Sequence, residues 1–115
     1  MINLDNILTK SGINSKELIE LLDARQRGEI DFLLVDVREP FEYEMEHIKG
    51  VDMLKPTSSF QNWANEFLKE HKDKNVIFTC RTDNRSGQVA NILREYGLNA
   101  INHLGGILDY NGETI

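Results

Sequence analysis

The most informative segment of the chain is Val76-Ile77-Phe78-Thr79-Cys80-Arg81-Thr82-Asp83-Asn84-Arg85-Ser86. Its first four residues are apolar or β-branched, which predicts a buried strand. A polar turn begins at Cys80. Residues 87–96 then repeat apolar side chains at helical spacing, and Gly97 is a typical helix stop. The segment therefore predicts a strand, a polar loop and a helix in direct succession.

The same alternation recurs on either side of this segment. Residues 32–37 form a second apolar run, closed by the polar turn Arg38-Glu39-Pro40. Pro40, in a first-turn position, and the acidic residues after it predict a short helix that stops before His47. The other expected elements are a helix from the N-cap candidate Ser15 to near Gly28, a brief strand at 51–54, an amphipathic helix at 59–71 with Trp63 in the core, a strand at Ala100-Ile101 and a last turn or helix at Gly105-Gly106.

Strands separated by helical segments of about ten residues imply βαβ units. The expected fold class is α/β, with a mostly parallel sheet and helices on both of its faces. In such sheets, ligands bind at the carboxyl ends of the strands. The polar turns after Val37 and Thr79 both fall at those ends, so they are the candidate functional loops.

Length and composition fit one ordinary domain. The 115 residues are 40% hydrophobic and 28% charged, close to globular averages. We expect a single domain over residues 1–115, in which residues 1–14 form an N-terminal extension. A net charge of -6 argues against nucleic acid or an anionic membrane as partner. The start has no signal-peptide pattern and no apolar run is long enough to cross a bilayer, so a cytoplasmic location is expected.

Cys80 is the single cysteine of the chain, which excludes an intrachain disulfide, a Cys-x-x-Cys redox pair and a zinc knuckle. His71 and His103 are isolated from other metal-ligating residues, so no metal site is expected. A thiol between a strand end and a helix start meets inward-pointing backbone N–H groups and the positive end of the helix dipole. Arg81 and Arg85 add positive charge, which favours a reactive thiolate. The alternative is that Cys80 is a small buried hydrophobe.

The chain resembles the rhodanese homology domain from about Ser15 onward. The resemblance rests on four segments in the order typical of that family: Val35-Asp36-Val37-Arg38-Glu39-Pro40, His47-Ile48-Lys49-Gly50, Cys80-Arg81-Thr82-Asp83-Asn84-Arg85-Ser86 and Gly105-Gly106-Ile107. It implies a three-layer fold with a central, mostly parallel sheet of about five strands. It also implies an active-site loop that runs from Cys80 to Arg85.

This resemblance implies a sulfurtransferase. The Cys80 thiolate would take a sulfane sulfur from thiosulfate or a persulfide and pass it to a thiol or cyanide, without metal or organic cofactor. The loop residues would bind substrate, and Asp36 and Arg38 would orient the loop. The implied partners are the small donor and acceptor, with a sulfur-relay protein as a further candidate. The loop residues given this substrate-binding role are Arg81, Thr82, Asp83, Asn84, Arg85 and Ser86.

Two other functions stay open. One is a non-catalytic binding or regulatory module built on the same fold. The other is a cysteine-dependent phosphatase, but phosphatases related to this fold have five residues between cysteine and arginine. Here four residues separate Cys80 from Arg85, and the smaller ring favours a sulfur atom over a phosphoryl group.

Some residues depart from the family pattern, and others are expected to have only structural roles. Asp83 stands where the family often has glycine; aspartate tolerates left-handed backbone, but its charge disfavours an anionic donor beside it. His103 occupies a usually apolar position.

His47 is expected to be a structural hydrogen-bonding residue. Gly105-Gly106 is expected either to allow close backbone approach or to form a turn without functional contact. The acidic residues Glu42, Glu44 and Glu46 are expected to form a solvated helical face without a catalytic role. The physiological donor, acceptor, pathway and oligomeric state are left open by the sequence.

Overall fold

The computed structural model describes residues 4–115 and shows an α/β fold around a parallel sheet. The five strands stand in the order β1-β5-β4-β2-β3, and every neighbouring pair is parallel. They are β1 (Gly12–Ile13), β2 (Leu33–Asp36), β3 (Met53–Leu54), β4 (Asn75–Thr79) and β5 (Asn99–His103). The predicted fold class is therefore confirmed.

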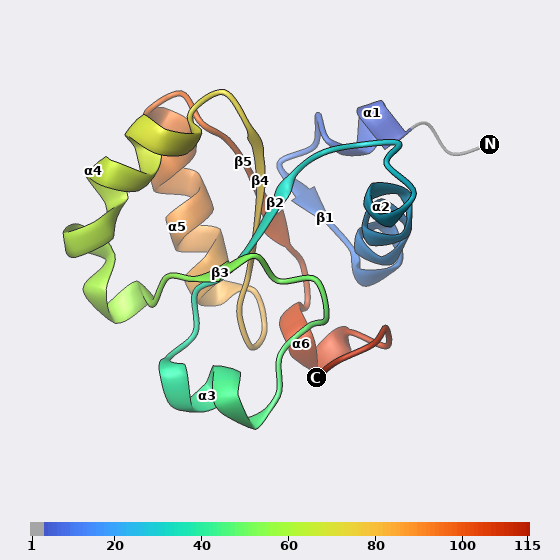
Figure 1. Ribbon diagram of the computed structural model, residues 1–115. Coiled ribbons are helices and arrows are strands. Elements are labelled where there is room, and N and C mark those ends of the chain that lie inside the picture. The colour runs from blue at the N-terminus through green and yellow to red at the C-terminus, as the bar shows by residue number, and fades with distance from the viewer. Residues whose placement is uncertain (1–3) are drawn as a thin grey trace.

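Helices cover both faces of the sheet (Figure 1). On one side lie α4 (Phe60–His71) and α5 (Asn84–Glu95); on the other lie α1 (Leu4–Ile7) and α2 (Ser15–Gln26). The short helices α3 (Pro40–Met45) and α6 (Gly106–Asp109) follow the carboxyl ends of β2 and β5, and a 3-10 turn (Thr57–Ser59) leads into α4.

Alternation along the central strands explains the two hydrophobic layers. In β4, Val76 and Phe78 pack with Trp63 and Phe67 of α4, whereas Ile77 packs with Leu18 of α2 on the opposite face. Successive strand side chains point to opposite faces, so a strand covered on both sides must be apolar throughout. Trp63 is buried, and its indole N–H donates to the carbonyl of Pro56, so its predicted core role is confirmed.

The N-terminal segment contributes more to the fold than an extension would. Residues 1–3 of the expected extension lie outside the described residues. Within the remainder, Ile7 and Leu8 are buried, and Gly12–Ile13 forms the edge strand β1 beside β5. The N-cap of α2 is Asn14 rather than Ser15: Asn14 and Glu17 form a reciprocal capping box.

Ser15 is instead the first residue of α2 and belongs to a buried polar cluster. His103 Nε2 lies 2.9 Å from Ser15 Oγ, and His103 Nδ1 lies 2.9 Å from Thr79 Oγ1. Ser15 Oγ donates its proton to Asp109, so the matching tautomer is a neutral imidazole that donates from Nε2 and accepts at Nδ1. Burial lowers the pKa of His103 to about 4, although the Asp109 carboxylate acts in the opposite direction.

Candidate active site

Cys80 directly follows the last residue of β4, at the carboxyl end of the central strand. Helix α5 begins at Asn84, three residues earlier than the predicted start at Gly87, so Asn84, Arg85 and Ser86 occupy its first turn. The connecting residues Arg81, Thr82 and Asp83 are exposed, as is Asn84. The Cys80 side chain itself is only 1% exposed. The site is a buried thiol beneath an exposed polar loop.

Ser86 is the hydroxyl partner of this sulfur. Cys80 Sγ lies 3.2 Å from Ser86 Oγ, and Ser86 Oγ lies 2.6 Å from Asn102 Oδ1 of β5. A hydroxyl carries one proton. While Cys80 is a thiol, it can donate to Ser86, which donates onward to Asn102. When Cys80 becomes an anion, the Ser86 hydroxyl can turn its proton from Asn102 to the sulfur, so Ser86 is placed to stabilise a sulfur anion.

Arg85 is held by an acidic side chain that the sequence did not link to the loop. Its Nη1 and Nη2 donate to the two carboxylate oxygens of Glu42 on α3, at 2.7 and 2.9 Å. This bidentate bond, which outweighs the opposing effect of burial, lowers the pKa of Glu42 to about 2. The same bond raises the pKa of Arg85. The expectation that Glu42 belongs to a solvated face is therefore wrong, because its carboxylate neutralises the loop arginine; Glu44 is exposed as expected.

Asp36 and Arg38 form a buried ion pair. Arg38 Nε lies 3.0 and 3.1 Å from the two Asp36 carboxylate oxygens, and Arg38 Nη2 lies 2.8 Å from Oδ2. Arg38 Nη2 also donates to the carbonyl of Glu46, just beyond α3. The pair thus anchors the helix that carries Glu42, and through Glu42 it is connected to Arg85. Its role in orienting the loop stays a prediction.

Helix α6 packs against the other side of the loop. The backbone N–H groups of Ile107 and Leu108 donate to the carbonyls of Cys80 and Arg81, at 2.9 and 3.1 Å. Gly106 has a φ of +60°, and a Cβ at this position would overlap the carbonyl oxygen of Thr82. The close backbone approach considered for the paired glycines is therefore present. Side chains cannot be added at Gly106 without moving the loop.

The backbone of Asp83 differs from expectation. It is the N-cap of α5 with φ -158° and ψ 0°, not a left-handed residue, and its side chain makes no capping hydrogen bond. In residues 4–115 positive φ values occur only at glycines. An L-residue at position 83 therefore costs no left-handed strain, which removes the geometric reason for glycine there.

His47 has the structural role expected of it. Its Nδ1 lies 2.9 Å from the carbonyl of Tyr43, and its ring stacks on the Tyr43 ring with centroids 3.8 Å apart. Within residues 4–115, the structure contains no cluster of three or more histidine, cysteine or acidic side chains that could hold a metal ion. No helix in that part of the chain is both long and apolar enough to cross a membrane.

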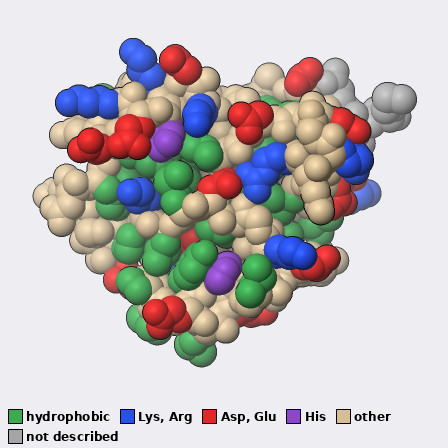
Figure 2. All heavy atoms as spheres, viewed as in Figure 1, with side chains coloured by type: hydrophobic (Ala, Val, Ile, Leu, Met, Phe, Trp, Pro, Cys, Tyr) green, Lys and Arg blue, Asp and Glu red, His purple; other side chains and the backbone are tan. Residues whose placement is uncertain are grey.

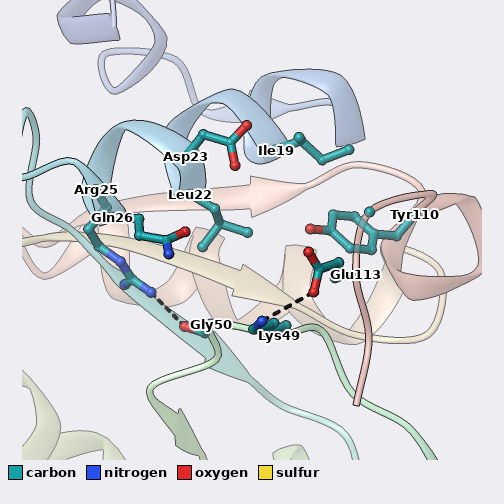
Figure 3. A pocket seen from close by; sticks show the side chains of 10 residues that line it. Ile19, Leu22, Asp23, Arg25, Gln26, Lys49, Gly50, Tyr110 and Glu113 are labelled. Carbon is teal, nitrogen blue, oxygen red and sulfur yellow. Dashed lines mark hydrogen bonds and ion pairs between the residues drawn. The ribbon is translucent and has the colours of Figure 1, made fainter.

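The cavities on the surface of residues 4–115 include two of the size of a ligand pocket. One, of about 580 Å³, adjoins the loop and is lined by Arg38, Glu42 and Arg81 together with apolar side chains. The other, of about 500 Å³, lies between α2 and the C-terminal segment (Figure 3). None of residues 80–86 lines this second cavity. Its two basic side chains already have partners: Lys49 forms an ion pair with Glu113, and Arg25 donates a hydrogen bond to the carbonyl of Gly50. The first cavity therefore adjoins the loop, through Arg81, the residue after Cys80.

Sequence reasoning missed Glu42 and Asn102 as neighbours of the loop. Glu42 lies three residues after Glu39, a capping spacing that its carboxylate does fulfil by accepting from the Glu39 N–H. That spacing could have placed Glu42 in the first turn of a helix, but it does not indicate a position beside Arg85. Asn102 is a polar, half-buried residue of β5, and its amide oxygen accepts from Ser86; its position in a β-forming segment was the one available signal of such a contact.

Comparison with known proteins identifies the family of this chain. The model of the rhodanese-like domain matches residues 13–113. A tRNA uridine(34) hydroxylase of Acinetobacter baylyi is 34% identical over 100 residues, which cover 81% of this chain and 32% of that protein. A rhodanese-like/PpiC domain-containing protein of Arabidopsis thaliana is 37% identical over 79 residues, which cover 67% of this chain and 26% of that protein. The chain thus spans a third or less of these relatives.

Solved structures show the same fold over whole domains. A rhodanese-related protein from Thermoplasma volcanium has a TM-score of 0.76 at 26% identity and covers 92% of this chain and 98% of that chain. A rhodanese-like domain protein from Staphylococcus aureus has a TM-score of 0.74 at 25% identity, covering 90% and 94%. This chain belongs to the rhodanese-like domain family.

Proposed function

We propose that the protein is a sulfurtransferase that carries a sulfane sulfur on Cys80. The observation that carries this proposal is the contact of Cys80 Sγ with Ser86 Oγ at 3.2 Å, at the junction of β4 and α5. A hydroxyl and a helix N-terminus both favour negative charge on sulfur. Membership of the rhodanese-like family supports the same chemistry.

Two displacement steps complete the proposed reaction. The Cys80 thiolate attacks the outer sulfur of thiosulfate, a sulfur–sulfur bond forms, and sulfite leaves with the electron pair of the broken bond. The product on the protein is a Cys80 persulfide anion. An acceptor thiolate or cyanide then attacks the outer sulfur, and Cys80 leaves as a thiolate. Charge and atoms balance in each step, without an external oxidant or reductant.

The electrostatics favour a donor that carries little negative charge. Arg85, which could have met an anionic donor, is already paired with Glu42, and Asp83 adds an exposed carboxylate to the loop. Arg81 is the loop cation without an ion-pair partner among residues 4–115. We therefore expect a persulfide donor to react with a higher kcat/KM than the dianion thiosulfate.

Turnover tests this function. Sulfur transfer to cyanide, followed as thiocyanate, is measured for the wild type, Cys80→Ser and Ser86→Ala with each donor. We expect no turnover in Cys80→Ser and a slower rate in Ser86→Ala, because the sulfur anion loses its hydroxyl donor. Equal rates in the wild type and Cys80→Ser would refute the proposal.

A non-catalytic role is the alternative that the burial of Cys80 favours, since structural cysteines are buried in this way. It predicts that Cys80 stays unmodified by iodoacetamide under native conditions. The hydroxylase activity named for the bacterial relatives is not assigned to this chain, which spans 32% of the Acinetobacter baylyi protein and has a net charge of -6.

A further inference from the structure

Exposed apolar side chains gather beside the active-site loop. Among residues 4–115, four of the seven exposed large hydrophobic side chains line the cavity next to the loop. They are Phe41 at 66% exposure, Met45 at 81%, Leu108 at 61% and Ile115 at 67%, and we call them the α3–α6 surface. Figure 2 shows hydrophobic side chains at the lower edge of the molecule, where α3 lies in Figure 1. Such a concentration typically marks a binding surface.

This surface is continuous with the loop that carries Cys80. Arg81, the residue after Cys80, lines the same cavity, and so does Glu42, the partner of Arg85. Leu108 belongs to the surface, and its backbone N–H donates to the Arg81 carbonyl. A molecule seated here would therefore touch the loop directly.

The size and character of the surface fit a polypeptide better than a small sulfur compound. Thiosulfate and cyanide have no apolar surface to bury, so they would gain nothing from these side chains. Protruding phenylalanine and methionine side chains beside a polar rim are typical of protein–protein interfaces. The cavity of about 580 Å³ between them could receive one or two side chains of a partner.

The charged side chains around the α3–α6 surface indicate which charge a partner carries. Glu44 and Glu46 are exposed on or just after α3, and neither pairs with a cation within residues 4–115. The Glu46 carboxylate accepts a hydrogen bond from the Thr114 hydroxyl. Arg81 is a cation without an ion-pair partner within residues 4–115, and it lines the same cavity. It is outnumbered by Glu44, Glu46 and the exposed carboxylate of Asp83, so the net charge attracts basic residues and repels phosphate groups, whether in nucleic acid or in an anionic membrane.

We propose that the α3–α6 surface docks a cysteine-bearing polypeptide segment with apolar side chains and basic flanking residues, and presents its thiol to the Cys80 persulfide. This inference rests on the proposed function. In the transfer step, the partner thiolate attacks the outer sulfur of the persulfide. A new sulfur–sulfur bond forms on the partner, the bond to Cys80 breaks, and Cys80 leaves as a thiolate.

The test uses three synthetic peptides with one cysteine each as probes. The first surrounds the cysteine with leucines and lysines, the second with leucines and glutamates, and the third with glycines and serines. The protein is first loaded with sulfur from a persulfide donor, and excess donor is removed. Intact mass spectrometry then follows the loss of sulfur from Cys80 and its gain by each peptide. We expect the leucine–lysine peptide to react about tenfold faster than the glycine–serine peptide, and the leucine–glutamate peptide to be slower than the leucine–lysine peptide.

Variants locate the effect on the surface. Phe41→Ser and Met45→Ser are expected to lower the ratio of the leucine–lysine rate to the glycine–serine rate about tenfold. The ratio cancels any general change in the reactivity of Cys80. Tyr96→Ser is the matched control, since Tyr96 is 72% exposed but lies at the end of α5, outside the cavity lining. Its ratio should equal that of the wild type.

Three results would overturn the inference. If Cys80 takes up no sulfur from any donor, the proposed function fails and the inference with it. If Cys80 loads but reacts with all three peptides at one rate, only the docking inference fails. If sedimentation shows a dimer that Phe41→Ser dissociates, the occupant is a second copy of this chain.

Discussion

The bond between Glu42 and Arg85 allows a quantitative prediction for Glu42→Gln. The pKa of Glu42 is about 2 instead of 4.5, mainly because of the bidentate bond to Arg85. At 1.36 kcal/mol per pKa unit, this difference corresponds to about 3 kcal/mol in favour of the charged form. Arg85 is 32% exposed, so solvent screening reduces the effect, and we expect Glu42→Gln to lower the free energy of unfolding by about 1–2 kcal/mol.

Urea denaturation at neutral pH measures this loss. With an m-value of about 1–3 kcal/mol/M, the unfolding midpoint should fall by about 0.3–2 M. Glu44→Gln on the same helix is the matched control, because Glu44 is exposed and makes no ion pair within residues 4–115. Its midpoint should be that of the wild type.

The pH dependence gives a second, independent check. The pKa of Glu42 is lowered in the folded state, so its contribution to stability is fully present above pH 4.5 and is lost as the pH falls through about 2. The difference between the wild type and Glu42→Gln should therefore shrink below pH 4.5. A difference that stays constant down to pH 2.5, or an unfolding midpoint like that of Glu44→Gln, would refute this reasoning.

Three further substitutions test the packing around the loop. Gly106→Ala should lower the free energy of unfolding by about 2 kcal/mol or more, because the added Cβ would overlap the Thr82 carbonyl. Gly28→Ala is the control: Gly28 also has a positive φ, +76°, but open space around it, so its free energy of unfolding should fall less in the same urea titration. Replacing His103 by leucine should reduce the loss of stability that the wild type shows between pH 6.5 and about 4, where the unfolded chain takes up a proton that the buried imidazole does not. His71, whose pKa is also lowered by burial, would account for the remaining loss. An unchanged pH profile would contradict the role of His103. Asp36→Asn should lower the free energy of unfolding by about 3–5 kcal/mol, measured by thermal or urea denaturation, because Arg38 would stay buried with an uncompensated charge. A loss below about 1 kcal/mol would contradict a stabilising role of that ion pair.

Local patterns in the sequence were sufficient for most of the fold. The apolar runs that became β2 and β4 were predicted because strands buried on both faces are apolar throughout. The helix at 59–71 was predicted from the spacing of Trp63 and Phe67 and is found at Phe60–His71. By contrast, β1 has two residues and α1 has four, which is too short for any periodic pattern. β1 forms because it pairs with β5, and Ile7 of α1 packs in the hydrophobic layer that also contains Leu18 and Leu21 of α2.

The candidate site was predictable where it depends on neighbours in sequence. The strand, turn and helix around Cys80 placed Ser86 close to the sulfur. The Glu42–Arg85 bond joins residues 43 positions apart, and nothing in the spacing of either side chain indicates the other. Asp83 could not be judged from its residue type, because its backbone conformation follows from the start of α5 one residue later.

The most direct test of the account is intact mass spectrometry after brief exposure to thiosulfate and, separately, to a persulfide donor. The account predicts that the wild type gains the mass of one sulfur atom, that cyanide removes it, and that Cys80→Ser gains nothing. The persulfide donor should load the protein faster, because Glu42 already neutralises Arg85. Absence of any sulfur adduct on a wild-type protein whose Cys80 does react with iodoacetamide would contradict it.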